Sequence, residues 1–175
     1  ATFYSSIFAH EVQASESHGT INSSYYRARI CRDVPCTNAL AGTINFRPAG
    51  VTPITIDDDD GMDGVAWGND LGWITFDPTG AEGVTIASTT GVLSGYAWAQ
   101  VGGWLNMSPT GYGVTINSSG EFTGYGWVGG VNGGWVKFDC SGAGIAANQC
   151  VKTDWRPGSV RGLVSTSTSS TTLSG

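Results

Sequence analysis

The chain has 175 residues, enough for one domain with a substantial hydrophobic core. Its net charge of -6 excludes a nucleic-acid-binding protein, because such a protein needs a basic surface against the phosphates. Charged residues make up only 13% of the chain, while 27 glycines and 7 tryptophans accompany many Val, Ile, Thr and Tyr residues. This composition predicts an all-β protein. The chain has no apolar run of about 18 residues, so no membrane-spanning helix is predicted.

Residues 1–20 are predicted to form an N-terminal arm that is apolar at its start. In an extended strand Phe3 and Ile7 lie on one face, and Tyr4 and Phe8 lie on the other. A strand with two apolar faces is buried on both sides. Two interpretations are open: a first core strand of this domain, or an arm that adds a strand to a neighbouring subunit.

Residues 21–63 are predicted to form an N-terminal β segment with a small disulfide loop and an acidic loop. The cysteines fall into two local pairs, and short loop closure predicts the disulfides Cys31–Cys36 and Cys140–Cys150. The competing interpretation is a metal site of four thiolates, but the close C-x-x-C spacing is missing. Disulfides indicate an exported protein, and a chain that begins at Ala1 fits the removal of a targeting peptide.

The acidic loop contains five aspartates interleaved with glycine: Asp57, Asp58, Asp59, Asp60 and Asp63. Clustered carboxylates in a flexible loop are suitable ligands for Ca²⁺, although the full EF-hand pattern is absent. The alternative is a solvated acidic linker. Both interpretations remain open at this stage.

Residues 64–139 contain three similar copies of about 30 residues each, which is typical of a repeat that must stack on its neighbours. The copies begin GVAWGNDLGWITF, GYAWAQVGGWLNM and GYGWVGGVNGGWVKF, and each pattern predicts a hairpin. The first two copies continue to a further strand, GVTI. We therefore expect a closed or stacked β body (prism, sandwich or solenoid-like) over residues 64–155, followed by a C-terminal strand and a Ser/Thr-rich tail over 156–175.

Each copy carries two tryptophans, which the turn of the hairpin brings opposite each other. The six are Trp67, Trp73, Trp98, Trp104, Trp127 and Trp135. Their strict repetition favours a shared core, in which aromatic pairs pack edge to face. The alternative is a set of exposed faces that stack on sugars, as tryptophans do in carbohydrate-binding modules.

Catalysis has little support in the sequence. The only histidines are His10 and His18, so the repeats contain none for a Ser-His-Asp or Cys-His arrangement. Asp70, Asp77 and Glu82 could form a carboxylate pair, but they lie at turns or in a single copy. We therefore expect no enzyme activity.

The segments GYAW…GGW and GVAWGNDLGWITFDPTG resemble a Trp-rich tandem repeat of predicted exported and surface proteins of bacteria. The general form of that repeat is G-Y-A-W, then G-W-I-x-F, then G-G-V-T-I, and the similarity covers residues 64–139 only. The resemblance implies a β-rich extracellular module at the cell surface, and it implies no catalytic residues.

These features predict a non-enzymatic extracellular structural protein, most readily a self-assembling subunit of a surface filament or pilus-like fibre joined by strand addition. The span 64–136 supports this hypothesis because it has no Lys or Arg to protect exposed strand edges. The predicted partner is then another copy of the chain. The alternative is a secreted carbohydrate-binding module or adhesin whose exposed Trp and Tyr faces bind glycans.

Overall fold

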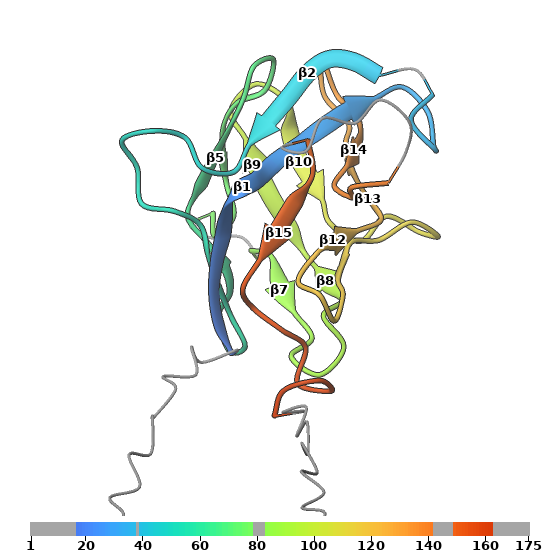
Figure 1. Ribbon diagram of the computed structural model, residues 1–175. Helices are drawn as coiled ribbons and strands as arrows, with labels where there is room; N and C mark the ends of the chain where they lie inside the picture. Colours follow the sequence, from blue (N-terminus) through green and yellow to red (C-terminus); the bar gives the residue numbers. More distant parts are fainter. Residues whose placement is uncertain (1–16, 38, 79–82, 142–148, 163–175) are drawn as a thin grey trace, which may run out of the picture.

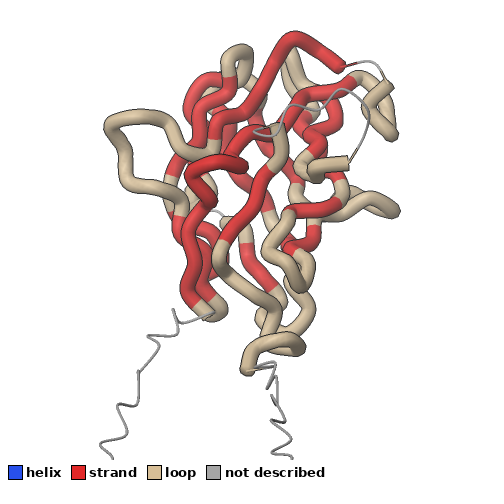
Figure 2. Tube along the Cα trace, in the orientation of Figure 1, coloured by secondary structure: helices blue, strands red, loops and turns tan. Residues whose placement is uncertain are grey.

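The computed structural model describes residues 17–37, 39–78, 83–141 and 149–162, and all regular elements among them are strands (Figure 2). The all-β prediction is confirmed. Among these residues there is no helix long and apolar enough to cross a membrane.

Eight of the strands form a closed antiparallel barrel (Figure 1). In chain order they are β1 (His18–Cys31), β2 (Ala39–Asn45), β5 (Val65–Gly68), β6 (Gly72–Thr75), β9 (Tyr96–Ala99), β10 (Gly103–Asn106), β13 (Tyr125–Val128) and β14 (Gly134–Lys137). Each strand pairs with the next one in this order, and β14 pairs with β1 to close the barrel. Both edges of every barrel strand are therefore paired, so the predicted exposed edges of the Trp-rich region do not occur in the barrel.

The interior of the barrel is filled by small residues facing larger ones. Within each hairpin an Ala or Gly of the first strand lies opposite an aliphatic residue of the second. The pairs are Ala28↔Ile44, Ala66↔Ile74, Ala97↔Leu105 and Gly126↔Val136. An eight-stranded barrel has an interior only wide enough for side chains to fill it, and this alternation fits that width.

Seven shorter strands lie outside the barrel, and Figure 1 shows several of them below it. They are β3 (Thr55–Asp57), β4 (Gly61–Asp63), β7 (Thr85–Ile86), β8 (Leu93–Ser94), β11 (Thr115–Ile116), β12 (Phe122–Thr123) and β15 (Val151–Thr153). β3–β4, β7–β8 and β11–β12 are hairpins. Backbone hydrogen bonds join each hairpin to the next, as from Leu93 N to Val114 O at 2.9 Å. β3 and β15 both pair with β1, so these contacts form a ring that begins and ends at β1.

Residues 21–63 belong to the same barrel as the Trp-rich region. The hairpin β1–β2 has the same register as the three Trp hairpins, with Ala28 opposite Ile44 as Ala66 is opposite Ile74. The sequence shows why: GTINFRPAGVTPITI of residues 42–56 aligns without a gap with GWITFDPTGAEGVTI of residues 72–86. A β segment is predicted here, but its similarity to the Trp hairpins was not recognised because it contains no tryptophan.

A single hydrophobic core joins all these parts. The rings of Phe46 and Phe76 lie 5.5 Å apart, and those of Phe46 and Phe138 lie 5.8 Å apart. All three rings are fully buried. The phenylalanines follow β2, β6 and β14, so the core connects the first, second and last hairpins of the barrel.

Candidate functional site

The six repeated tryptophans lie on the outside of the barrel as three cross-strand pairs. We call these the Trp pairs: Trp67/Trp73, Trp98/Trp104 and Trp127/Trp135. Their ring centroids are 5.0, 4.8 and 4.9 Å apart, and each pair is packed edge to face. Five of the six side chains are between 38% and 45% exposed. The prediction that these residues form the core is therefore wrong.

The alternation of side chains along each strand explains this placement. Ile74 and Phe76 point into the core, so Trp73 and Thr75 must point outward. The narrow barrel interior accepts Ala and Ile at facing positions but leaves no room for indole rings. The seventh tryptophan, Trp155, is the one that is fully buried.

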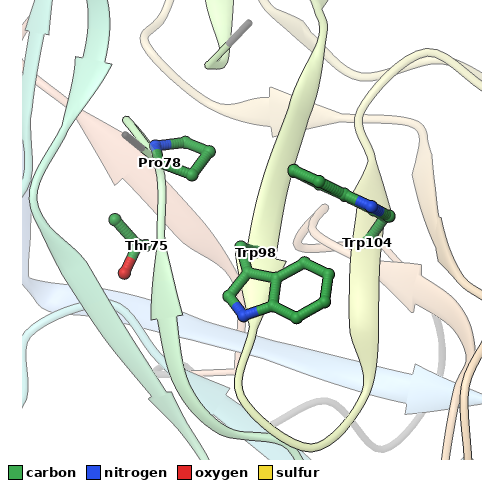
Figure 3. Close-up of a pocket in the computed structure, with 4 residues that line it drawn as sticks. All are labelled: Thr75, Pro78, Trp98 and Trp104. Carbon is green, nitrogen blue, oxygen red and sulfur yellow. The ribbon is translucent and has the colours of Figure 1, made fainter. Parts of the chain in front are cut away.

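An open groove runs beside the Trp98/Trp104 pair. It is lined by Thr75, Pro78, Trp98 and Trp104. Figure 3 shows the two indoles on neighbouring strands, with Thr75 at the end of β6 and Pro78 just after that strand, on the other side of Trp98. Thr75 lies directly opposite Trp98 in the register of β6 and β9. The groove therefore combines two exposed aromatic rings with a hydroxyl that can donate and accept hydrogen bonds.

The same arrangement of residue types recurs at the other two Trp pairs. Asn45 lies opposite Trp67, and Asn106 lies opposite Trp127, as Thr75 lies opposite Trp98. The Oδ1 atoms of the two asparagines accept hydrogen bonds from the backbone N–H two residues ahead, at 2.9 and 2.8 Å. Their amide nitrogens remain as donors on the outer surface.

Tyrosines extend the aromatic surface at the third pair. The ring of Tyr112 lies 4.9 Å from Trp135 and 6.3 Å from Tyr125, in edge-to-face contacts. Tyr112 is itself 44% exposed. At this pair, therefore, Trp127 and Tyr112 present the aromatic surface to solvent.

The hairpin β1–β2 has different side chains at the matching positions. Arg29 and Thr43 lie opposite each other where the other hairpins carry two tryptophans. Across the barrel closure, Arg29 lies opposite Lys137, whose Nζ is 3.1 Å from Asp139 and 5.7 Å from the centre of the Tyr125 ring. This sector of the barrel is basic. Of the hairpins with the Trp pairs, β5–β6 and β9–β10 have no Lys or Arg, and β13–β14 has only Lys137 at its end.

The acidic loop is the turn of the short hairpin β3–β4. The Oδ1 atom of Asp57 accepts hydrogen bonds from the backbone N–H of Asp59 and Asp60, at 2.8 and 3.3 Å. Asp58 instead binds Arg161 and accepts a hydrogen bond of 3.0 Å from the indole nitrogen of Trp155. Asp57 and Asp58 thus have different partners.

The predicted calcium site gains no support from this arrangement and stays a prediction. Asp57, Asp60 and Asp63 do line a polar hollow, together with His18, Thr55, Gly61 and Asp77. However, no group of three or more His, Cys, Asp or Glu side chains among the described residues has an arrangement that could hold a metal ion.

Two of the other predictions involve residues outside the described part: the arm residues Phe3, Tyr4, Ile7 and Phe8, and Glu82 of the conceivable carboxylate pair.

Both predicted disulfides are confirmed. Cys31 is bonded to Cys36, and Cys140 is bonded to Cys150, with Cα–Cα distances of 5.2 and 4.8 Å. The alternative of a metal site built from four thiolates is excluded. Two disulfides are consistent with a protein secreted from the cell.

The ion pair of Asp58 should make the stability of the protein depend on pH. The Arg161 guanidinium lowers the pKa of Asp58, and the indole N–H of Trp155 acts in the same direction, whereas burial partly opposes them. A carboxyl whose pKa is lower in the folded state contributes stability above its unfolded pKa of about 3.9, and this contribution is lost as the pH falls through the folded pKa.

We therefore expect Asp58→Asn to lower the free energy of unfolding by about 1–2 kcal/mol near neutral pH. The difference from the wild type should shrink as the pH falls below about 4, because Asp58 is then protonated first in the unfolded state and, at its lower pKa, also in the folded state. Urea denaturation at a series of pH values measures it. Asp59→Asn is the matched control, since Asp59 is exposed and should show a small effect at every pH. A difference that is independent of pH would contradict the assigned role of the ion pair.

Comparisons of the chain with family models, with curated proteins and with solved structures found no match. The function must therefore be argued from the site alone.

Proposed function

We propose that this chain is a secreted, non-catalytic carbohydrate-binding module that holds an uncharged glycan against its Trp pairs. The observation that carries the proposal is the exposure of Trp98 and Trp104, at 42% and 45%, beside the hydroxyl of Thr75 in an open groove. Exposed aromatic surface in a hollow marks a binding site more often than it serves stability alone.

The chemistry of this surface suits a sugar ring. A pyranose has an apolar face of C–H groups, which can stack on an indole, and a rim of hydroxyls, which need polar partners. The groove offers both, because Trp is large and apolar while Thr75 can donate and accept hydrogen bonds. Asn45 and Asn106 supply the polar groups beside the other pairs.

The charge of the surface favours an uncharged glycan over an acidic one. No Lys or Arg occurs between residues 64 and 136. This span contains all six tryptophans of the Trp pairs and their polar neighbours Thr75 and Asn106, whereas Asn45 lies before it. The chain as a whole carries a net charge of -6. An acidic polysaccharide would be repelled at long range and would find no cation on the strands that carry the Trp98/Trp104 groove.

The filament hypothesis has less support from the described residues. Strand addition needs a free strand edge, and each of the eight barrel strands is paired on both sides. Residues 1–16 of the predicted donor arm (residues 1–20) lie outside the described residues, and the arm's last residues belong to β1. Self-assembly through that arm remains a prediction, and comparing the sedimentation of the full chain with that of a chain lacking residues 1–10 would test it.

Affinity electrophoresis tests the proposed function. Native gels that contain soluble neutral polysaccharides (a β-glucan, a xylan and a galactomannan) should retard the protein in at least one case. An alginate gel controls for charge and should not retard it. Migration unchanged in all the neutral gels would contradict the proposal.

A further inference from the structure

The Trp pairs are three versions of one local structure. In each, a Trp of the first strand lies directly opposite a Trp of the second, and the ring centroids are 4.8–5.0 Å apart. In each, the first Trp also lies opposite a short polar side chain of the preceding hairpin. A proline follows each polar residue at the same spacing, in Asn45…Pro48, Thr75…Pro78 and Asn106…Pro109. A ligand beside one pair therefore meets two indoles and a short polar side chain, as it would beside the other two.

The three pairs face in different directions. They lie on the hairpins β5–β6, β9–β10 and β13–β14, which are successive sectors of a closed barrel and together supply six of its eight strands. Outward-facing side chains on successive sectors of a closed barrel diverge from its axis. A single extended glycan chain can lie along one pair, but it cannot lie flat on all three.

The remaining sector of the barrel, the hairpin β1–β2, has a different surface. Arg29 and Thr43 replace the two tryptophans, and Lys137 replaces the polar neighbour. The Nε atom of Arg29 is buried without a hydrogen-bond partner, so it is not presented to a ligand. The number of equivalent sites is therefore three.

We infer that the barrel carries three binding sites of one kind for uncharged glycans, so that one molecule joins separate glycan chains. This inference rests on the proposed function and adds the number and direction of the sites. It also gives the internal repetition a role, because a single site would need only one Trp pair. The expected biochemical behaviour is that of a cross-linking protein.

Isothermal titration calorimetry with neutral hexasaccharides (cellohexaose, xylohexaose and mannohexaose) tests the number of sites. We expect about three bound molecules per chain for at least one of these sugars. The double variant Trp98→Thr/Trp104→Thr, which introduces the residue found at Thr43, should lower the number to about two. Thr43→Ala, in the hairpin β1–β2, is the matched control and should leave the number of bound molecules at about three. If the Thr variant fails to fold, a second double variant, Trp98→Phe/Trp104→Phe, keeps an aromatic pair at this position. It should weaken sugar binding at about one of the three sites.

The outcomes separate the inference from the proposed function. One bound sugar per chain, lost in a single double variant, would overturn the three-site inference and leave glycan binding intact. No binding of any neutral sugar, in solution or in the gels, would overturn both. Binding of a proline-rich peptide in place of every sugar would also overturn both, because such peptides dock in aromatic grooves. Light scattering gives a second measure: the wild type should aggregate a soluble neutral polysaccharide, and a variant with one remaining Trp pair should not.

Discussion

Replacing Trp155 with alanine should lower the free energy of unfolding by about 3–5 kcal/mol, as for other buried aromatic residues. Trp155 is fully buried, its indole nitrogen donates to Asp58 at 3.0 Å, and the Arg161 guanidinium lies 5.1 Å from its ring centre. It packs closely on β1, where a Cβ added at Gly19 would lie 2.4 Å from the Trp155 backbone nitrogen. The substitution would therefore leave a cavity and also remove a partner of Asp58.

Trp73→Ala is the control for this prediction, because Trp73 is 40% exposed. It should cost only about 1–2 kcal/mol, from the edge-to-face contact and a smaller loss of buried area. Chemical denaturation followed by circular dichroism measures both variants. Equal losses of stability would mean that the assignment of buried and exposed tryptophans is wrong.

Replacing Gly95 with alanine should lower the free energy of unfolding by about 3 kcal/mol or more, from backbone strain together with a steric clash. Gly95 precedes the hairpin of Trp98 and has a φ of +84°, and a Cβ there would lie 2.1 Å from the carbonyl oxygen of Gly83. Since that oxygen belongs to the backbone, relief of the clash requires the hairpin to shift against its neighbour.

Gly111→Ala separates the two causes. Gly111 has nearly the same φ, +83°, but a Cβ there meets no other atom of the described residues within 4 Å. Only the strain of the left-handed backbone remains, and it should cost about 1–2 kcal/mol. Thermal and urea denaturation of the two variants give the comparison. An equal effect in both would show that the close approach at Gly95 does not matter to stability.

Much of the local structure could be predicted from the sequence because it depends on local signals. The hairpins follow from turn residues between β-branched and aromatic runs, and both disulfides follow from short loop closure. Closure of the barrel could not be predicted, because it depends on the pairing of β14 with β1. The residues of that pairing, such as Arg29 and Lys137, are far apart in the sequence and share no motif.

The placement of the tryptophans could have been predicted from a signal that was present. In GWITF, Ile74 and Phe76 alternate with Trp73 and Thr75, so one face is entirely apolar and the other contains a polar residue. The polar Thr75 marks the outer face. Repetition of the tryptophans does not by itself indicate a core, because it serves an outer row of cross-strand pairs equally well.

The local role of the acidic run follows from its position more than from its composition. Asp57–Asp60 and Gly61 occupy the place that Ala87–Thr90 and Gly91 occupy in the next short hairpin, and each segment connects the two strands of its hairpin. The charge of one residue, Asp58, is matched by Arg161 from the other end of the chain. No local pattern predicts that contact, since the two residues are 103 positions apart.

The indole N–H signals in a ¹H–¹⁵N spectrum offer the most direct test of glycan binding at the Trp pairs. The chain has seven tryptophans, and six of them form the pairs. Titration with the neutral hexasaccharides should shift the signals of these six and leave that of Trp155 in place, because its indole is buried and bonded to Asp58. If all seven signals stay unchanged at millimolar sugar, the Trp pairs do not bind neutral glycans.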